Sequence, residues 1–193
     1  MSVASAPVPG LVPPSRHLVL VGLPTVGKST VGALVAERLG IPFRDADDEI
    51  AAAAGCSVSD IFASEGEAGF RRAEERTIAS MLGGPPSVIG VGGGAVLSPV
   101  TRARLAGHDV VWLSADPQAL HDRLAAPVVA TRPMLAGSPR QRLAMLAAQR
   151  DELYAQVAHH VVAVDGLGPD EVAAQVLAAV TAPVPDVSAC EAP

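Results

Sequence analysis

The residues with the clearest chemistry lie at positions 22–30, which read GLPTVGKST. Gly22, Gly27, Lys28 and Ser29 fit the pattern G-x-x-x-x-G-K-[ST] between an apolar run and a helical pattern. Such glycines let backbone N–H groups surround a phosphate chain, while the lysine reaches the outer phosphates and the hydroxyl can bind Mg²⁺. The alternative is a chance glycine turn before a helix. The context on both sides favours a nucleotide-binding P-loop.

Two aspartates, Asp45 and Asp47, come at the end of the predicted strand 41–47. Because side chains alternate along a strand, we expect both carboxylates on one face of the chain, near the P-loop edge of the sheet. One can support the Mg²⁺ shell while the other approaches a substrate hydroxyl. The alternative is a solvated acidic turn, since Asp48 and Glu49 follow.

Two arginines, Arg71 and Arg150, lie on the apolar faces of predicted helices. A guanidinium group on a buried face requires an acidic partner or an anionic ligand. The alternatives are an ion pair of Arg71 with Glu74 or Glu75 on its own helix, and extension of the Arg150 side chain to water.

Two further segments could contact a ligand. The three glycines at 92–94 follow an apolar run and permit close approach to the backbone, although an ordinary tight turn would also explain them. Arg132 lies in a segment rich in prolines and glycines (127–139), which predicts a long loop. A loop that carries one arginine is typical of a phosphotransferase lid, and the alternative is a solvated loop arginine.

The elements that must position these residues alternate along the chain. The alternation predicts an α/β fold of three layers, with a central parallel sheet and helices on both faces. In such sheets ligands bind at the carboxyl ends of the strands. The predicted strands are 17–22, 41–47, 87–94, 109–114 and 160–165, and the predicted helices are 28–39, 46–54, 57–64, 67–82, 99–106, 116–125, 140–157 and 168–181.

The composition fits a globular protein of one domain. The chain has 193 residues, of which 49% are hydrophobic and 18% charged, which excludes a largely disordered protein. The segments 1–15 and 182–193 are rich in proline and lack periodicity, so we expect disordered tails around a single domain at 16–181. The net charge of −6 argues against a nucleic-acid partner.

Cysteine usage and hydropathy indicate a cytoplasmic location. The only cysteines, Cys56 and Cys190, form neither a disulfide framework nor a zinc pattern. No apolar stretch approaches the length of a membrane span, and the first fifteen residues lack the features of a secretory signal. We therefore expect a cytoplasmic protein without a membrane partner.

From Val19 to about Val164 the chain resembles the shikimate kinases, which are related to the nucleoside-monophosphate kinases. The resemblance rests on GLPTVGKSTVG, FRDAD, SVSDIFASEGEAGFRRAE, GVGGGAV, TRPML and QRDELY, in that order. The combination of GE-x-x-FR with three glycines is more specific than the P-loop, which indicates only a nucleotide. The resemblance implies a P-loop kinase fold, a substrate-binding segment at about 46–82 and a lid at about 127–139. The implied reaction is transfer of the ATP γ-phosphate to the 3-hydroxyl of shikimate, in the pathway to chorismate and aromatic amino acids.

The resemblance also implies roles for individual residues. Asp47 would bind the substrate hydroxyls and accept the proton. Lys28 and Arg132 would act on the transferring phosphate. Ser29 would bind Mg²⁺, with Asp45 in its outer shell. The remaining implied contacts are with ATP (Gly22, Thr25, Val26, Gly27, Lys28, Ser29, Thr30, Arg132, and Arg123 stacked on adenine) and with shikimate (Arg71 and Arg150 on the carboxylate, and the Gly93 N–H on a hydroxyl).

The chain departs from the family pattern at three places. Thr25 and Val26 stand where a glycine is usual, so we expect the loop to form with a stiffer backbone. The lid reads TRPML where RPLL is usual, which conserves side-chain volume. The segment 165–167 replaces a basic residue that many members carry near the adenine.

Two other functions compete with this prediction. A gluconate-type or nucleoside-monophosphate-type kinase would share the P-loop but not GE-x-x-FR followed by three glycines. A regulatory protein that keeps the fold without catalysis is disfavoured by the intact Lys28, Ser29, Asp47 and Arg132. The prediction is a monomeric shikimate kinase that uses ATP with Mg²⁺.

Overall fold

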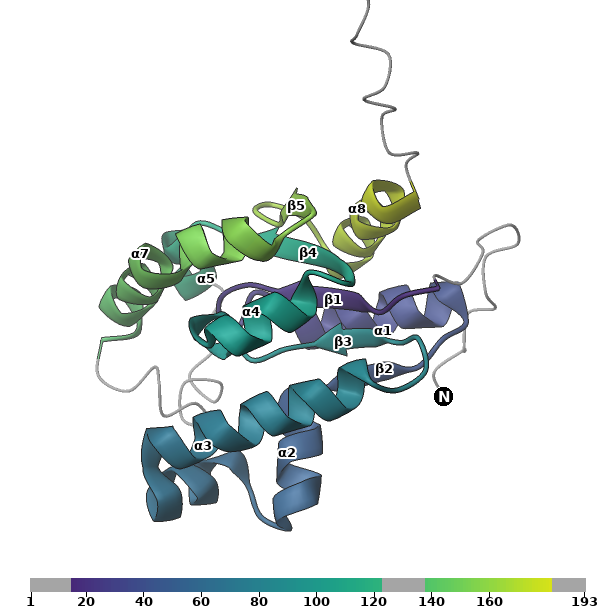
Figure 1. The fold of residues 1–193 in the computed structure, drawn as a ribbon. Coiled ribbons are helices and arrows are strands. Elements are labelled where there is room, and N and C mark those ends of the chain that lie inside the picture. The colour runs from purple at the N-terminus through teal and green to yellow at the C-terminus, as the bar shows by residue number, and fades with distance from the viewer. Residues whose placement is uncertain (1–14, 123–137, 182–193) are drawn as a thin grey trace, which may run out of the picture.

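The computed structural model describes residues 15–122 and 138–181, and the centre of this part is a five-stranded parallel sheet (Figure 1). The strand order is β2-β3-β1-β4-β5. The strands are β1 (Leu18–Val21), β2 (Phe43–Asp45), β3 (Val88–Gly90), β4 (Asp109–Ser114) and β5 (His160–Ala163). The helices are α1 (Lys28–Leu39), α2 (Ala46–Ala54), α3 (Val58–Leu82), α4 (Pro99–Leu105), α5 (Pro117–Asp122), α7 (Pro139–Val157) and α8 (Pro169–Thr181), and a short 3₁₀ helix, η1, spans Ala95–Leu97.

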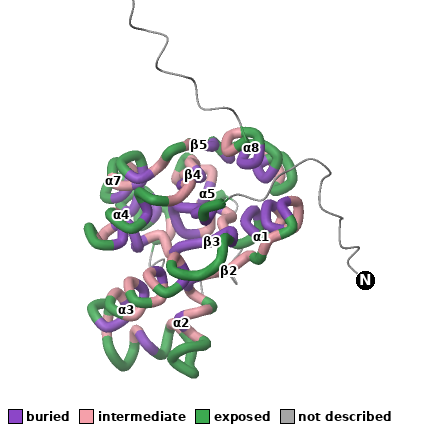
Figure 2. The backbone as a smooth tube through the Cα atoms, turned by 45° about the vertical axis from the view of Figure 1, so that its right-hand side comes forward, coloured by how far each residue is buried: buried purple, intermediate pink, exposed green. Residues whose placement is uncertain are grey.

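Helices cover both faces of the sheet. The neighbouring helices α1 and α8 lie on one face, and α4 and α7 lie on the other (Figure 1). The middle strand β1 has the sequence LVLV, and all four of its residues are buried. Figure 2 shows buried backbone at the centre of the molecule, around β3. A parallel strand that is covered on both faces requires such a continuous apolar run. The predicted three-layer α/β fold is therefore confirmed.

Local sequence explains where several elements begin and end. Gly40 has φ 67° at the carboxyl end of α1, and its N–H donates to Ala36 O, so a left-handed glycine ends this helix. Ser57 and Asp60 form a reciprocal capping box at the start of α3. Strands β2 and β3 are shorter than the predicted runs 41–47 and 87–94. The first stops because Asp45 caps α2, and the second stops because the chain turns at the three glycines that follow.

The segment that projects from the sheet has its own small core. The two helices predicted at 57–64 and 67–82 form α3, which is broken at Gly66 with φ 69° and ψ −177°. Ile50, Ile61 and Phe70 are buried together where α2 packs against both halves of α3. This core joins α2 to both halves of α3.

Several predictions from the sequence lie outside the described residues. They include most of the two tails, nearly all of the loop 127–139, and the last residues of the predicted helix 116–125. No helix within 15–122 and 138–181 is long and apolar enough to cross a membrane.

Phe43 of β2 packs into a space that two glycines leave open. A Cβ added to Gly32 of α1 would overlap the Phe43 ring, and one added to Gly90 of β3 would come 3.3 Å from its Cζ atom. The ring therefore lies against backbone on two sides. Because Gly32 is in a helix interior, glycine is there for packing and at a cost in helix propensity.

We expect Gly32→Ala to lower the free energy of unfolding by about 1 kcal/mol, because overpacking against the ring outweighs the gain in helix propensity. In a Phe43→Leu background the same substitution should instead stabilise by about 0.5–1 kcal/mol. Urea unfolding of the four proteins measures both effects. Equal effects of Gly32→Ala in the two backgrounds would show that the ring does not limit this position.

Candidate active site

The P-loop between β1 and α1 has a backbone that few residues can adopt. Gly22 has φ 144° and Gly27 has φ 102°. A Cβ on Gly22 would lie 2.5 Å from Leu113 O of the neighbouring β4, so this glycine is also required by close packing. Thr25 is the non-glycine residue with positive φ (68°) among the described residues, and its hydroxyl donates to Pro24 O at 2.5 Å. The loop thus forms despite the departure at Thr25, which adopts a left-handed conformation that non-glycine residues rarely take.

Lys28 and Ser29 begin α1 and face the loop. Lys28 Nζ donates to Gly22 O at 2.9 Å and to Leu23 O at 2.8 Å, so its charge lies over the mouth of the P-loop. Ser29 Oγ donates to Asp45 Oδ2 at 2.6 Å. A hydroxyl and a carboxylate in direct contact beside the first turn of α1 supply the oxygen atoms that Mg²⁺ prefers, so these two residues fit the metal that the motif implies.

The prediction that Asp45 and Asp47 share one face of a strand is wrong. Asp45 ends β2, whereas Asp47 lies in the first turn of α2. The physical reason is helix capping, since Asp45 Oδ1 accepts the N–H of Asp47 at 3.0 Å. One oxygen of Asp45 therefore starts the helix while the other binds Ser29. The two aspartates still lie close to the P-loop, through a turn rather than through a strand.

Arg71 and Glu74 of α3 form the first half of a charged cluster. Arg71 Nη1 lies 2.6 Å from Glu74 Oε2, and Arg71 Nη2 lies 3.4 Å from Glu67 Oε1. The alternative interpretation of Arg71, an ion pair with Glu74, is thus present. Glu74 is only 2% exposed. Its burial raises the pKa of the carboxyl, an effect that Arg71 partly offsets and nearby Asp47 adds to.

Arg150 of α7 is the second half of the cluster. It is 1% exposed, which rules out extension of its side chain to water. Within the described residues, neither Nε nor Nη1 of Arg150 has a hydrogen-bond partner. Burial lowers the pKa of this guanidinium, and the neighbouring Arg71 acts in the same direction, while Tyr154 and Glu74 oppose it. A buried cation with unused donors is suited to an anion that arrives from outside.

The three glycines at 92–94 bring these groups together, and each one has a different neighbour. A Cβ on Gly92 would overlap Glu74 Oε1 and lie 3.5 Å from Asp47 Oδ1. A Cβ on Gly94 would overlap the Arg71 guanidinium. The turn therefore does more than reverse the chain, because side chains from α2 and α3 pack closely against its backbone.

Gly93, the middle glycine, connects the turn to the P-loop and to α7. A Cβ at this position would lie 3.1 Å from Pro24 Cδ and 3.2 Å from Gly22 O. Its carbonyl accepts the Tyr154 hydroxyl at 2.6 Å, and Tyr154 lies one helical turn beyond Arg150. The P-loop and the charged cluster are thus in contact through one short segment of backbone.

The structure brings together most of the predicted site residues, at the carboxyl edge of the sheet. A cavity of about 710 Å³ opens beside the cluster and is lined by Phe62, Glu67, Leu97, Leu146 and Arg150 among others. Arg123 and Arg132 lie outside the described residues. Glu74 and Tyr154 also belong to the site, although neither was predicted to do so. Helical spacing was the available signal, since Glu74 follows Arg71 by three residues and Tyr154 follows Arg150 by four.

A P-loop at the carboxyl edge of a parallel sheet, next to the buried Arg150, the half-buried Arg71 and an acidic turn, defines a small-molecule phosphotransferase with the P-loop kinase fold. Residues 24–181 match the family model described as shikimate kinase. The chain belongs to the shikimate kinase family and is an ATP-dependent kinase. The family resemblance is therefore confirmed, and the gluconate-type and nucleoside-monophosphate-type alternatives are not supported.

Individual relatives agree with this assignment. A shikimate kinase from Streptomyces avermitilis is 50% identical over 161 residues, which cover 83% of this chain and 93% of that protein. A shikimate kinase from Streptomyces coelicolor is 46% identical over 163 residues, covering 84% and 94%. Among solved structures, the shikimate kinase from Acinetobacter baumannii in complex with shikimate is 32% identical with a TM-score of 0.81, and the similarity covers 86% of this chain and 92% of that chain.

The burial of Arg150 leads to a prediction about stability. We expect Arg150→Met to raise the free energy of unfolding by about 1–3 kcal/mol in the absence of ligands, because a similar volume remains while a desolvated charge is removed. The exposed Arg142 of the same helix is the matched control, and Arg142→Met should change stability by less than about 0.5 kcal/mol. Chemical unfolding of the three proteins measures this. Destabilisation by Arg150→Met would mean that the guanidinium stabilises the fold.

Proposed function

We propose that this kinase transfers the ATP γ-phosphate to the 3-hydroxyl of shikimate, giving 3-phosphoshikimate and ADP, through the residues assembled around the glycine turn. The observation that carries the proposal is the contact between the two halves of the site. Gly93 lies against the P-loop residues Pro24 and Gly22, and its neighbours in the turn lie against Asp47, Glu74 and Arg71. A phosphate chain in the P-loop would thus lie next to a small acid held by the arginines.

The nucleotide half would use the start of α1. Backbone N–H groups of residues 22–30 would surround the phosphates, helped by the dipole of α1. Lys28 Nζ, which lies on the carbonyl groups of Gly22 and Leu23, would turn to the phosphate oxygens. Ser29 and Asp45 would hold Mg²⁺, the first directly and the second in the outer shell, and the metal would neutralise charge on the phosphates.

The acceptor half would use the charged cluster. The guanidinium groups of Arg71 and Arg150 would bind the carboxylate of shikimate, and the Gly93 N–H would bind a hydroxyl. Asp47 would accept the proton of the 3-hydroxyl. The hydroxyl oxygen would attack the γ-phosphorus at the same time, and ADP would leave. Glu74 fixes Arg71 by a 2.6 Å contact, so it would position one arm of the clamp.

The remaining roles rest on the sequence. Arg132 would stabilise charge on the transferring phosphate, and Arg123 would stack on the adenine. We also propose that the protein acts in the cytoplasm as a monomer, without nucleic-acid or membrane partners. Catalysis would then depend mainly on positioning and charge neutralisation.

The direct test is release of ADP with shikimate, with gluconate, and without an acceptor. With ATP present in all three reactions, we expect ADP release only when shikimate is the acceptor. We expect Lys28→Ala to abolish this turnover without changing cooperative unfolding. Turnover that persists in Lys28→Ala would contradict the P-loop assignment. Turnover only with gluconate would contradict the acceptor assignment.

Asp47→Asn tests the proton acceptor. The substitution keeps the shape of the side chain but removes its basicity, so we expect turnover to fall by about 10²–10⁴-fold with ATP affinity unchanged. Steady-state kinetics with shikimate, together with a separate ATP-binding titration, measure both quantities. A fall of less than tenfold would leave Asp47 with an orienting role only.

The two arginines Arg132 and Arg150 should affect different kinetic constants. A residue that meets the phosphate mainly in the transition state contributes to turnover, so Arg132→Ala should lower kcat strongly with little change in the KM for shikimate. Arg150→Ala should mainly raise that KM, by a factor equivalent to about 1.5–3 kcal/mol for a charge-assisted pair. Steady-state kinetics at saturating ATP compare the two variants, and the reverse pattern would exchange the two roles.

A further inference from the structure

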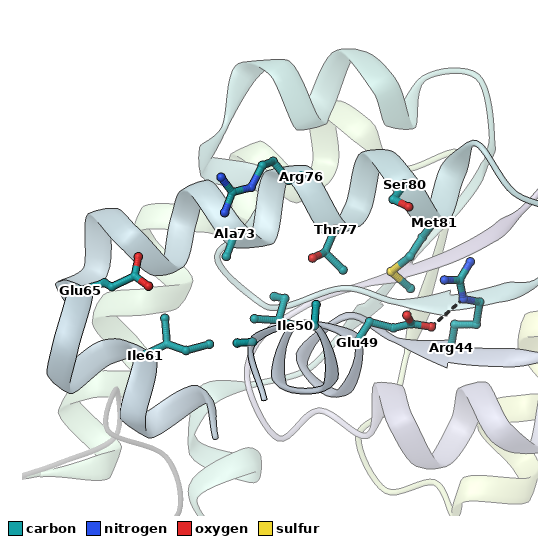
Figure 3. A pocket seen from close by; sticks show the side chains of 12 residues that line it. Arg44, Glu49, Ile50, Ile61, Glu65, Ala73, Arg76, Thr77, Ser80 and Met81 are labelled. Atoms are coloured by element: carbon teal, nitrogen blue, oxygen red, sulfur yellow. Dashed lines mark hydrogen bonds and ion pairs between the residues drawn. The ribbon is translucent and has the colours of Figure 1, made fainter. Parts of the chain in front are cut away.

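A second cavity lies between α2 and α3, away from the glycine turn (Figure 3). Its volume is about 440 Å³, within the range of small-molecule sites. The described residues that line it come from β2, α2 and α3, and they are Arg44, Glu49, Ile50, Ala53, Ala54, Ile61, Glu65, Ala73, Arg76, Thr77, Ser80 and Met81. None of them has a role in the proposed reaction.

Helix α3 separates this cavity from the substrate clamp. Successive residues of a helix are rotated by about 100°, so Ala73 and Ser80 lie on the side of α3 opposite Arg71. Arg71 points to the glycine turn, where it would overlap a Cβ on Gly94. A ligand in the cavity would therefore contact neither shikimate nor ATP.

The floor of the cavity is apolar, with Ile50 and Ile61 from the core of the projecting segment and Met81 from the main core. Ile50 is 1% exposed, Ile61 3% and Met81 0%. These side chains offer a closed apolar surface at the bottom of an otherwise polar opening. Such a surface fits the hydrocarbon part of a ligand.

Arg76 and Glu65 carry opposite charges at the mouth of the cavity but do not form an ion pair with each other. Figure 3 shows Arg76 and Glu65 projecting from the two halves of α3, and among the described residues neither has an ion pair or a hydrogen bond. By contrast, Arg44 and Glu49 at the other end are joined at 2.8 Å. The mouth thus presents one unpaired cation and one unpaired anion above an apolar floor.

We propose that this cavity binds a small α-amino acid with an apolar side chain. The carboxylate of the ligand would face Arg76, its ammonium group would face Glu65, and its side chain would rest on Ile50, Ile61 and Met81. Both charges of one zwitterion are needed to complement the mouth, and a simple acid or amine complements only half of it.

Isothermal titration calorimetry of the full chain, without ATP or shikimate, tests the proposal. The probes are L-phenylalanine and L-leucine, with phenethylamine and 3-phenylpropionate as analogues that each lack one charge. The variants are Arg76→Gln and, as a matched control, Arg72→Gln, because Arg72 is also exposed on α3 but does not line this cavity.

We expect at least one amino acid to bind, and we expect Arg76→Gln to weaken binding by about tenfold or more, as for a lost charge-assisted hydrogen bond. Arg72→Gln should leave the affinity within a factor of about two. The single-charge analogues should bind more weakly than phenylalanine. The proposal is overturned if neither amino acid binds, if an analogue binds as well as phenylalanine, or if the two arginine variants behave alike. The readout is binding alone, so failure here leaves the kinase assignment intact.

Discussion

Burial of charge is the constraint around which this molecule is organised. Arg150 is almost fully buried, and Glu74 lies equally deep against Arg71. Arg71 is paired directly with this carboxylate, and Arg150 interacts with it electrostatically, in a place where each isolated charge would be costly. Within the described residues Arg150 keeps two buried donor atoms without a hydrogen-bond partner, which is a cost in the folded protein and an advantage when an anion binds. If the acceptor's carboxylate binds between Arg71 and Arg150, as we propose, the substrate completes this electrostatic arrangement.

The glycine turn after β3 makes this arrangement compatible with a P-loop a few ångströms away. A single side chain at 92, 93 or 94 would displace Glu74, the P-loop backbone or Arg71, respectively. The turn also accepts the Tyr154 hydroxyl, which ties α7 and its arginine to the centre of the sheet. Side chains from α2, α3 and α7 can therefore all approach this turn, because its glycines have no side chains in the way. The same packing leaves the opposite side of α3 free to form a second cavity.

Much of the fold could be predicted because hydrophobic periodicity is a local property. The run LVLV, the helical spacing of 28–39 and the cap at Gly40 are each decided by a few neighbouring residues. The prediction that Asp45 and Asp47 lie in one strand was wrong. A single hydrogen bond, from the Asp47 N–H to Asp45 Oδ1, makes the chain start a helix where the strand was expected to continue. Glu74 was considered only as a partner of Arg71, since its burial depends on contact with a turn eighteen residues further along the chain. The second cavity arises from the packing of α2 on α3, which no local pattern specifies. The roles of Arg123 and Arg132 remain predictions.

We propose that the charged cluster of Arg71, Glu74 and Arg150 is completed by the carboxylate of the acceptor. The most direct measurement is the thermal unfolding midpoint of the protein with shikimate and with its methyl ester, at equal concentrations and without nucleotide. Because ligand binding to the folded state raises stability by mass action, we expect a clear increase with shikimate and little or none with the ester, which keeps the ring and hydroxyls but loses the charge. Equal increases in the unfolding midpoint with the two compounds would contradict the account, because the arginines would then not be binding the carboxylate.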